Sequence, residues 1–386
     1  MTEKLYYLDS HLASFQAEVI SCTQTEKGFE VVLDRTAFYP LGGGQAADTG
    51  VLGKARVLDT REQGKDIIHL CDAPLTPGTQ VEGTIDYQDR FVRMQQHSGE
   101  HIVSGIIHQR WGYHNTGFHM NLQSVVIDFD GMIPAEALPE IEAEANRAVM
   151  RNIPVRVFTP GPEELAALSY RTKRALPWPV RIVEIPGCDT CACCGTHVAA
   201  TGEIGLIKLF SAIPFRGGTR MEMACGVPAL ALLNRVFEQN RQVSRLLSAQ
   251  ITQTGQAVEK LLSTLESWKT KALNLEKQSL LARVDAFRGA GDCFTFGGEL
   301  SPDGLRELTD GAAKVSGGVT AVFGETPEGF DYCLALPGGD LRSLNKEMNE
   351  VLSGRGGGKP PFQMGRLRAS KEEIRQFFLG KGFRQV

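Results

Sequence analysis

Two short stretches, HSGEH at residues 97–101 and CCGTH at residues 193–197, constrain the fold of this chain more than any other feature. Residues four apart on a helix project from one face, so His97 and His101 can share a metal ion. A thiolate and an imidazole, here from Cys193 and His197, are good zinc ligands beside them. Together they predict a site with three histidines and one cysteine, built from segments about 90 residues apart.

HSGEH also permits a second interpretation. As H-x-x-E-H it matches the signature of inverzincin proteases, in which two histidines hold zinc and the glutamate, here Glu100, serves as the base. That interpretation needs a third ligand further along the chain, with three candidates: Glu163, Glu164 and Glu184. It leaves CCGTH without a role.

The cysteine-rich turn has an alternative of its own, a structural zinc knuckle formed by Cys188, Cys191, Cys193 and Cys194. Nine cysteines, an odd number with four of them in this turn, indicate reduced thiols and metal chemistry more than a disulfide framework. No secretory signal opens the sequence, and no run of about 18 apolar residues could span a bilayer. We therefore expect a cytoplasmic protein with no membrane partner.

The chain has 386 residues, of which 42% are hydrophobic, so two to four domains are expected. Residues 1–85 show short alternating runs separated by Gly and Pro, which predicts a small β-rich, barrel-like domain. Its glycine-rich segment FYPLGGGQAADTG lacks the spacing of nucleotide-phosphate loops. Three consecutive glycines indicate a turn or the wall of a ligand pocket.

Residues 86–228 mix helix and strand patterns, beginning with a helix over 86–111 that Asp86 would cap and that carries both histidines of HSGEH. Residues 229–288 repeat apolar residues at helical spacing. We expect a long helix, broken near Gly255 into an antiparallel hairpin, whose apolar seam either drives homodimerisation or packs only on its own neighbours. Residues 289–386 alternate strand and helix. The predicted fold class is α+β.

The net charge is −4, but the chain end is basic. From Gly354 to Val386 eight Lys or Arg stand against two Glu, a local charge of +6. This pattern is typical of a solvated terminal helix or of a tail that contacts phosphates.

HSGEH followed by CCGTH resembles the editing domain shared by alanyl-tRNA synthetases and the freestanding AlaX proteins, whose zinc site is built from H-x-x-x-H and C-x-x-x-H. FYPLGGGQAADTG resembles the glycine-rich motif of that family. The helical segment and the module containing GRGGGKPPFQMG resemble the C-terminal domain of alanyl-tRNA synthetase, as in long AlaX proteins. Two residues depart from the family pattern: Cys194 replaces a glycine, and Glu100 stands where Thr or Gln is common.

The resemblance implies one Zn²⁺ held by His97, His101, Cys193 and His197, and hydrolysis of mischarged Ser-tRNA(Ala), with Gly-tRNA(Ala) as a second substrate. Glu100 is then a candidate catalytic residue that orients the second histidine or a water. Candidates for the substrate pocket are Gly43, Gly44 and Gln45. Candidates for contacts with tRNA are Arg216, Arg220, Arg355 and Lys359. The last two lie in residues 289–386, which we expect to form a tRNA-binding or oligomerisation domain. A tRNA-binding module with a structural zinc and no turnover is the alternative.

Overall fold

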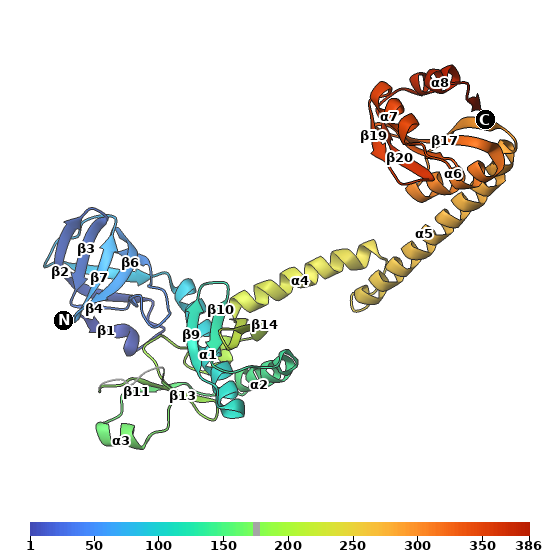
Figure 1. Cartoon of the computed structure of the whole chain (residues 1–386). Helices are drawn as coiled ribbons and strands as arrows, with labels where there is room; N and C mark the ends of the chain where they lie inside the picture. The colour runs from blue at the N-terminus through green and yellow to red at the C-terminus, as the bar shows by residue number, and fades with distance from the viewer. Residues whose placement is uncertain (173–177) are drawn as a thin grey trace. The chain divides into compact units, whose positions relative to one another are not determined.

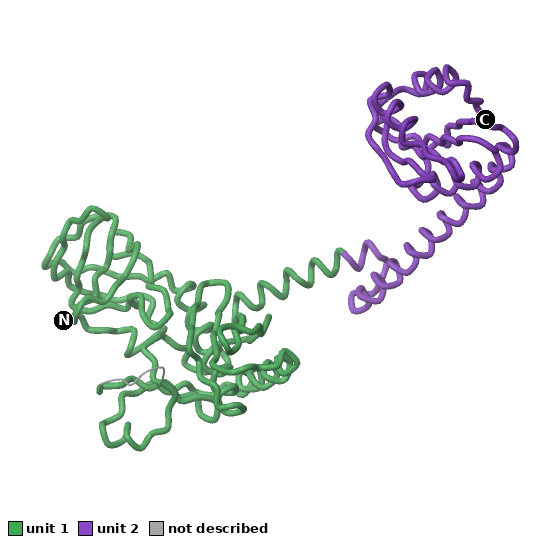
Figure 2. Tube along the Cα trace, in the orientation of Figure 1, with its two compact units in different colours: residues 1–242 green, residues 243–386 purple. Residues whose placement is uncertain are grey.

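The computed structural model describes residues 1–172 and 178–386, and it divides into two compact units, residues 1–242 and 243–386 (Figure 2). Both combine helices with β-sheets, which confirms the α+β class. Within the described ranges no helix combines the length and the apolar character that crossing a membrane requires.

The first unit begins with a closed six-stranded barrel (Figure 1). Alternate residues of its strands point inward, as Phe15, Ala17 and Val19 do in the first of them, and these residues form the barrel core. The strands in their order around the barrel are β2 (Ser14–Thr25), β3 (Gly28–Leu33), β7 (Asp66–Cys71), β6 (Ala55–Gln63), β5 (Gly50–Leu52) and β8 (Gln80–Ile85). The short strands β1 (Glu3–Lys4) and β4 (Arg35–Thr36) pair beside it.

Helix α1 (Tyr87–Trp111) is the central element of the first unit, and every residue from Arg93 to Ile107 is buried. Asp86 is the N-cap residue, as predicted, although its side chain makes no capping bond and instead accepts a hydrogen bond from Thr49. Because a buried polar group needs a hydrogen-bond partner, a helix that buries Gln, His, Ser and Glu side chains must be surrounded by matching groups. The candidate site lies where those groups converge.

Two sheets and a helix surround α1 and form the largest apolar core of the unit with it. One sheet consists of β14 (Ile207–Phe215), β15 (Gly218–Cys225), β10 (Val125–Phe129) and β9 (Asn115–Met120), in that order. The other consists of β11 (Arg156–Phe158), β12 (Ile182–Ile185) and β13 (Asp189–Ala192). The helices are α2 (Leu138–Met150), which packs on α1, and the short α3 (Pro162–Ala167).

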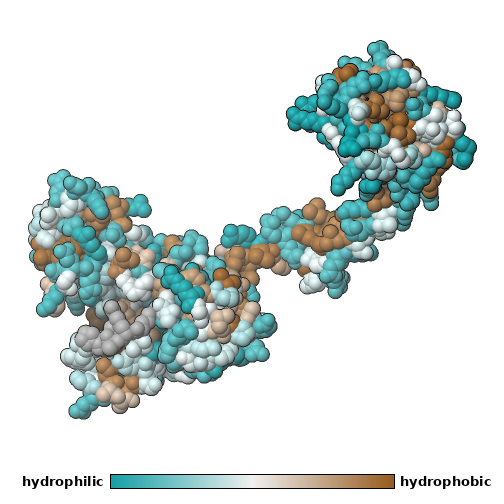
Figure 3. Space-filling model, in the orientation of Figure 1, coloured by the Kyte–Doolittle hydropathy of each residue, from teal (hydrophilic) through white to brown (hydrophobic). Residues whose placement is uncertain are grey.

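The predicted helical region consists of α4 (Val227–Leu246) and α5 (Thr254–Val284). The break lies at residues 247–253, whereas Gly255 is inside the first turn of α5. Exposed apolar side chains recur along α5, and Figure 3 shows hydrophobic patches on the helical segment. We call five of them the α5 seam: Val258, Leu261, Leu265, Trp268 and Leu275.

The second unit is built on one six-stranded sheet in the order β19-β20-β18-β17-β16-β21. Apolar cores lie on it, one of them formed with α5 and α6. The strands are β16 (Gly291–Gly298), β17 (Gly317–Thr326), β18 (Gly329–Ala335), β19 (Gly354–Gly357), β20 (Phe362–Leu367) and β21 (Arg384–Gln385). The helices after α5 are α6 (Pro302–Ser316), α7 (Arg342–Val351) and α8 (Lys371–Gly380).

Candidate metal centre and active site

The glycine-rich segment is anchored to α1 by a buried ion pair. Asp48 accepts a hydrogen bond from the backbone N–H of Tyr39 at 2.7 Å and from Nε of Arg90 at 2.9 Å. Arg90, on the first turn of α1, is fully buried and also donates to the carbonyl of Ala37 at 2.6 Å. Because a buried charge is tolerated only when it is paired, these bonds hold the loop in one place beside the helix.

Four side chains that can ligate a metal ion meet at the middle of α1. His97 and His101 project from the helix, and Cys193 and His197 come from the turn that follows β13. The Sγ atom of Cys193 lies 3.4 Å from Nε2 of His97 and 3.4 Å from Nε2 of His197. The ligand atoms of all four residues lie within 4.8 Å of one another. This cluster can therefore hold a metal ion.

Each histidine of the cluster has its other ring nitrogen held by a second residue. Nδ1 of His97 lies 3.3 Å from Oε1 of Gln45, Nδ1 of His101 lies 2.9 Å from Oδ2 of Asp189, and Nδ1 of His197 lies 3.2 Å from Oγ of Ser98. An amide oxygen and a carboxylate can only accept, so Nδ1 of His97 and of His101 carries the proton. Their Nε2 lone pairs are then free to face an ion, the arrangement found around metal-binding histidines.

Asp189 is in turn held by Arg171. The guanidinium donates from Nε to Oδ1 at 2.6 Å and from its terminal nitrogen to Oδ2 at 2.7 Å. Burial on its own would raise the pKa of Asp189, but the hydrogen bonds from His101 and Arg171 lower it. The chain from Arg171 through Asp189 to His101 therefore fixes a negative charge behind the second histidine of HSGEH.

The buried surroundings shift two of the ligands toward the forms that bind a metal ion. Burial would raise the pKa of the Cys193 thiol, but the neighbouring His97 and His197, with hydrogen bonds from His101 and His197, lower it well below its usual value. Burial and the neighbouring His97 lower the pKa of His197 to about 3, so its imidazole is neutral. A thiolate and a neutral imidazole are the forms that bind metal ions. For His101, burial opposes protonation, but the hydrogen bonds with Asp189 and Cys193 raise the pKa, so a metal ion would compete with a proton for this imidazole.

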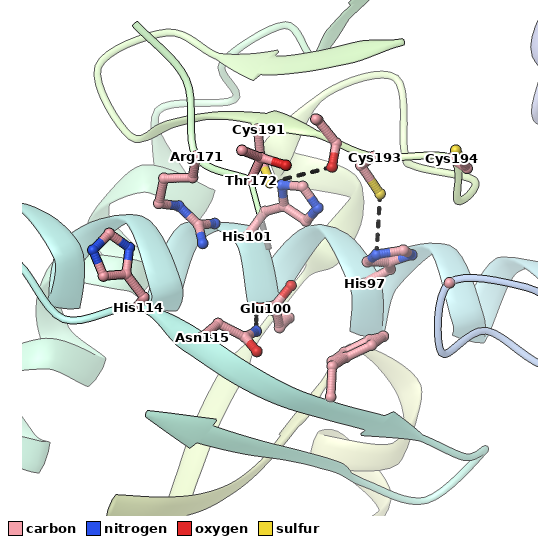
Figure 4. A pocket seen from close by; sticks show the side chains of 13 residues that line it. His97, Glu100, His101, His114, Asn115, Arg171, Thr172, Cys191, Cys193 and Cys194 are labelled. Atoms are coloured by element: carbon pink, nitrogen blue, oxygen red, sulfur yellow. Dashed lines mark hydrogen bonds between the residues drawn. The ribbon is translucent and has the colours of Figure 1, made fainter. Parts of the chain in front are cut away.

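A pocket of about 450 Å³ opens beside the cluster (Figure 4). Its walls include His97, His101 and Cys193 from the cluster itself. Phe118 on β9 stacks on the ring of His97 at 5.1 Å between centroids. The remaining lining residues are Gly43, Glu100, His114, Asn115, Arg171, Thr172, Cys191, Ala192 and Cys194.

The three residues expected at the substrate pocket have three different positions. Gly43 lines the pocket. Gly44 has a φ of +83°, and a Cβ there would lie 2.4 Å from the ring of Phe118, so glycine lets that ring reach His97. Gln45 is fully buried behind the cluster, where its amide bonds to His97 and to Thr196. Gln45 thus positions the first histidine and is not among the residues that line the pocket.

Glu100 does not orient the second histidine, because Asp189 does so. Its Oε1 accepts hydrogen bonds from Oγ of Ser104 at 2.5 Å and from Nδ2 of Asn115 at 2.6 Å. Glu100 lies three residues after His97 and four residues before Ser104, so the three side chains lie on the same side of α1. Glu100 is buried and lines the pocket.

The alternative ligand sets do not assemble among the described residues. Of the four cysteines of the turn, Cys193 alone belongs to the four-residue cluster. Cys191 belongs to a second group with His101 and Asp189, but there the carboxylate is already paired with Arg171. Neither group contains the glutamates considered for the protease interpretation, Glu163, Glu164 and Glu184.

The basic residues expected to contact tRNA lie on the surface of their own units. Arg220 forms two hydrogen bonds with Asp128, at 2.7 and 2.8 Å, and its guanidinium lies 3.6 Å from the ring centroid of Phe215. Arg216, at the turn between β14 and β15, lies 5.0 Å from the same ring. In the second unit Arg355 and Lys359 are exposed, and no ion pair is formed by either with a described residue.

Several residues of the site were not predicted from the sequence. Ser98 lies inside HSGEH and Asp189 lies in the cysteine-rich turn, and a short polar side chain near the ligands was the available signal for each. Gly195 of CCGTH is a further residue of the site, because a Cβ there would lie 2.2 Å from Cε1 of His97. Arg171 and Asn115 have no motif around them, and only the fold brings them to the pocket.

The sequence is similar to known proteins along most of its length. Residues 180–223 match the family model of the threonyl and alanyl tRNA synthetase second additional domain, and residues 5–89 match that of class II (A) tRNA synthetases. The alanyl-tRNA editing protein AlaX-L of Pyrococcus horikoshii is 27% identical over 97% of this chain and 96% of its own. An alanine–tRNA ligase of Thermofilum pendens is 31% identical over 96% of this chain but only 43% of its own. The alanyl-tRNA editing protein Aarsd1-A of Xenopus laevis is 30% identical over 91% of this chain and 90% of its own. At this identity across almost the full length of both proteins, the chain belongs to the family of alanyl-tRNA editing proteins.

Proposed function

We propose that this protein hydrolyses the aminoacyl ester of mischarged tRNA(Ala) in trans, with Ser-tRNA(Ala) as the main substrate and Gly-tRNA(Ala) as a second one. The observation that carries the proposal is the cluster of three histidines and one cysteine opening on a pocket of about 450 Å³. The names of the full-length relatives, alanyl-tRNA editing proteins, support the substrate class.

The need for such an activity has a physical basis. A synthetase site that accepts alanine cannot strongly exclude serine, which adds only a hydroxyl, or glycine, which only lacks a methyl. A second, hydrolytic site must then reject Ala-tRNA(Ala). It can do so with a polar group that bonds the serine hydroxyl and is left unpaired by alanine.

The donor set fits zinc, because thiolate sulfur and imidazole nitrogen are the ligands that zinc prefers in proteins. A bound zinc ion would supply Lewis acidity for the attack of water, or anchor the free amino or hydroxyl end of the substrate. The chain's own residues then have separate tasks. His97, His101, Cys193 and His197 hold the ion, while Gln45, Asp189 and Ser98 fix the orientation of the three imidazoles.

We assign the editing reaction to residues 86–228 and the binding of tRNA, or oligomerisation, to residues 289–386. Arg216 and Arg220 in the first unit, and Arg355 and Lys359 in the second, are the basic residues proposed to contact phosphates. Exposed guanidinium and ammonium groups make such contacts strongly dependent on salt. Homodimerisation through the α5 seam or through residues 289–386 stays a prediction.

The alternative to a deacylase is a tRNA-binding module with a structural zinc and no turnover, which is compatible with the same metal cluster and the same basic residues. One assay separates it from the deacylase and from a peptidase: purified protein is incubated with Ser-tRNA(Ala), Ala-tRNA(Ala) and a peptide, with and without a chelator. We expect serine to be released, alanine to be retained, and the release to stop when the metal is removed. Binding without release would favour the module, release that survives the chelator would exclude a zinc-dependent mechanism, and peptide cleavage would support the protease.

A further inference from the structure

One end of the pocket presents two hydrogen-bond acceptors that lack donors. Oε1 of Glu100 is saturated by Ser104 and Asn115, but no described residue donates to Oε2. Asn115 is 6% exposed, and its Oδ1 is buried without a partner. Both residues line the pocket, where Figure 4 shows them side by side below the helix.

The orientation of the Asn115 amide follows from its neighbour. A carboxylate only accepts hydrogen bonds, so Asn115 must turn its NH₂ group toward Glu100, and its oxygen is the atom left over. Buried polar atoms in folded proteins are nearly always paired. The buried amide oxygen of Asn115 therefore calls for a ligand that donates, and the carboxylate oxygen of Glu100 that no described residue bonds lies in the same pocket.

The charges of the pocket say which kind of donor fits. Glu100 forms no ion pair with any residue that the structure describes. The guanidinium of Arg171 is bound by Asp189 and interacts with Glu100 through a weaker electrostatic attraction. A hydroxyl supplies one donor and no charge, but an ammonium supplies three donors and a positive charge. Hydrogen bonds between an ammonium and a carboxylate are the stronger kind.

We propose that Glu100 and Asn115 bind the α-ammonium group of the aminoacyl ester, an inference that rests on the proposed function. Glu100 lies three residues after His97 and directly before His101, so a group bound to it lies beside the metal cluster. In an aminoacyl ester a single carbon separates the amino nitrogen from the carbonyl carbon. Anchoring the amine therefore brings the scissile ester to the cluster, and Glu100 is a binding residue, not the base.

The proposal also states what Glu100 does not do. Serine, glycine and alanine share the amino group, so this anchor positions every aminoacyl ester and does not select the side chain. Discrimination against alanine must come from another part of the pocket. The departure from the family pattern at position 100 thus changes how the ester is held.

The test uses the metal-loaded, full-length protein and adenosine that carries serine through a non-hydrolysable 3′ amide, with the amine either free or acetylated. Calorimetry should show the free amine binding at least about tenfold more tightly than the acetylated one, as expected for a charge-assisted bond. In Glu100→Gln this preference should fall to about twofold or less, because the free amine loses affinity and the acetylated ligand does not. Asn115→Ala should reduce the preference in part. Glu140→Gln, an exposed carboxylate on α2, is the matched control and should leave it unchanged.

An amine preference that is unchanged in Glu100→Gln would overturn the inference, whether the affinities for the two ligands stay the same or fall equally. If that variant instead lost a preference for the seryl amide over the corresponding alanyl amide, the two acceptors would be assigned to the serine hydroxyl. Metal content and melting temperature show whether Glu100→Gln is folded. Deacylation of Ser-tRNA(Ala) by the same preparation tests the proposed function separately, since binding with the expected preference but without deacylation refutes only that function.

Discussion

At the scale of single residues, the metal cluster depends on the groups behind its ligands. Asp189 is the clearest case, because it accepts from His101 on one side and from Arg171 on the other, and it is almost fully buried. An amide in its place would carry no charge and would turn an NH₂ group, which cannot accept, toward one of the Arg171 nitrogens. The second histidine of HSGEH would then face a weaker acceptor that is less firmly held.

Asp189→Asn should weaken zinc binding about 10- to 100-fold, the usual cost of losing a residue that orients a ligand. The measurement is competition with a chromophoric chelator at neutral pH. Glu184→Gln is the matched control, because that carboxylate lies on the neighbouring strand β12 and pairs with the exposed Arg156. Equal affinities of Asp189→Asn and the wild type would show that the Arg171–Asp189 pair has no role in holding the metal.

At the scale of elements, the barrel contains a buried histidine that responds to acid. His69 on β7 is fully buried, with Nδ1 3.1 Å from the carbonyl oxygen of Val31 and Nε2 2.8 Å from the hydroxyl of Thr36. Burial lowers the pKa of His69 to about 4, although the bond to Val31 opposes this shift. Its imidazole is therefore neutral in the folded barrel at pH values where the unfolded chain is protonated.

The barrel should lose stability as the pH falls from about 6.5 to 4, because the unfolded state binds one more proton over this range. The loss from His69 alone should approach about 3 kcal/mol, and it should be absent above pH 6.5. We expect His69→Gln to be less stable at pH 7 but to have a flatter pH profile, measured as the free energy of unfolding of the barrel in urea. Parallel profiles of the two proteins would contradict the assignment.

The helices and strands also show which parts of the fold and of the candidate site can be predicted from the sequence. Local periodicity and ligand chemistry predict the helix over 86–111 and the meeting of HSGEH with CCGTH. The pairing of β10 with β15, some 90 residues later, leaves no local trace, since strand registers are decided by the tertiary packing. For the same reason Arg171 and Asn115 could not be assigned to the pocket. Local signals find ligands more readily than the residues that support them.

At the scale of the whole molecule, basic residues of the second unit differ in whether they are free to meet a polyanion. Of the eight Lys and Arg between Gly354 and Val386, four form ion pairs with acidic residues: Arg366, Lys371, Arg375 and Lys381. Arg355 and Lys359 form none with the described residues. The formal charge of this region therefore overstates the charge available to phosphates.

The double substitution Arg355→Gln and Lys359→Gln should weaken binding of tRNA(Ala) and reduce the slope of log K against log salt by about two, one for each lost phosphate contact. Fluorescence anisotropy over a series of salt concentrations measures both quantities. Arg375→Gln with Lys381→Gln removes the same formal charge from paired residues and should change the slope less. If the two double variants behave alike, the position of the charge is irrelevant and the assigned contacts are wrong.

Gln45 couples the metal centre to the glycine-rich segment. It belongs to the segment that Asp48 and Arg90 tie to α1, and its amide holds His97 and the backbone of CCGTH at Thr196. A ligand that binds only the folded state stabilises whatever must be ordered to receive it. An ion held by the cluster would therefore stabilise a loop that supplies none of its ligands, and order in the glycine-rich wall of the pocket would increase with occupancy of the centre.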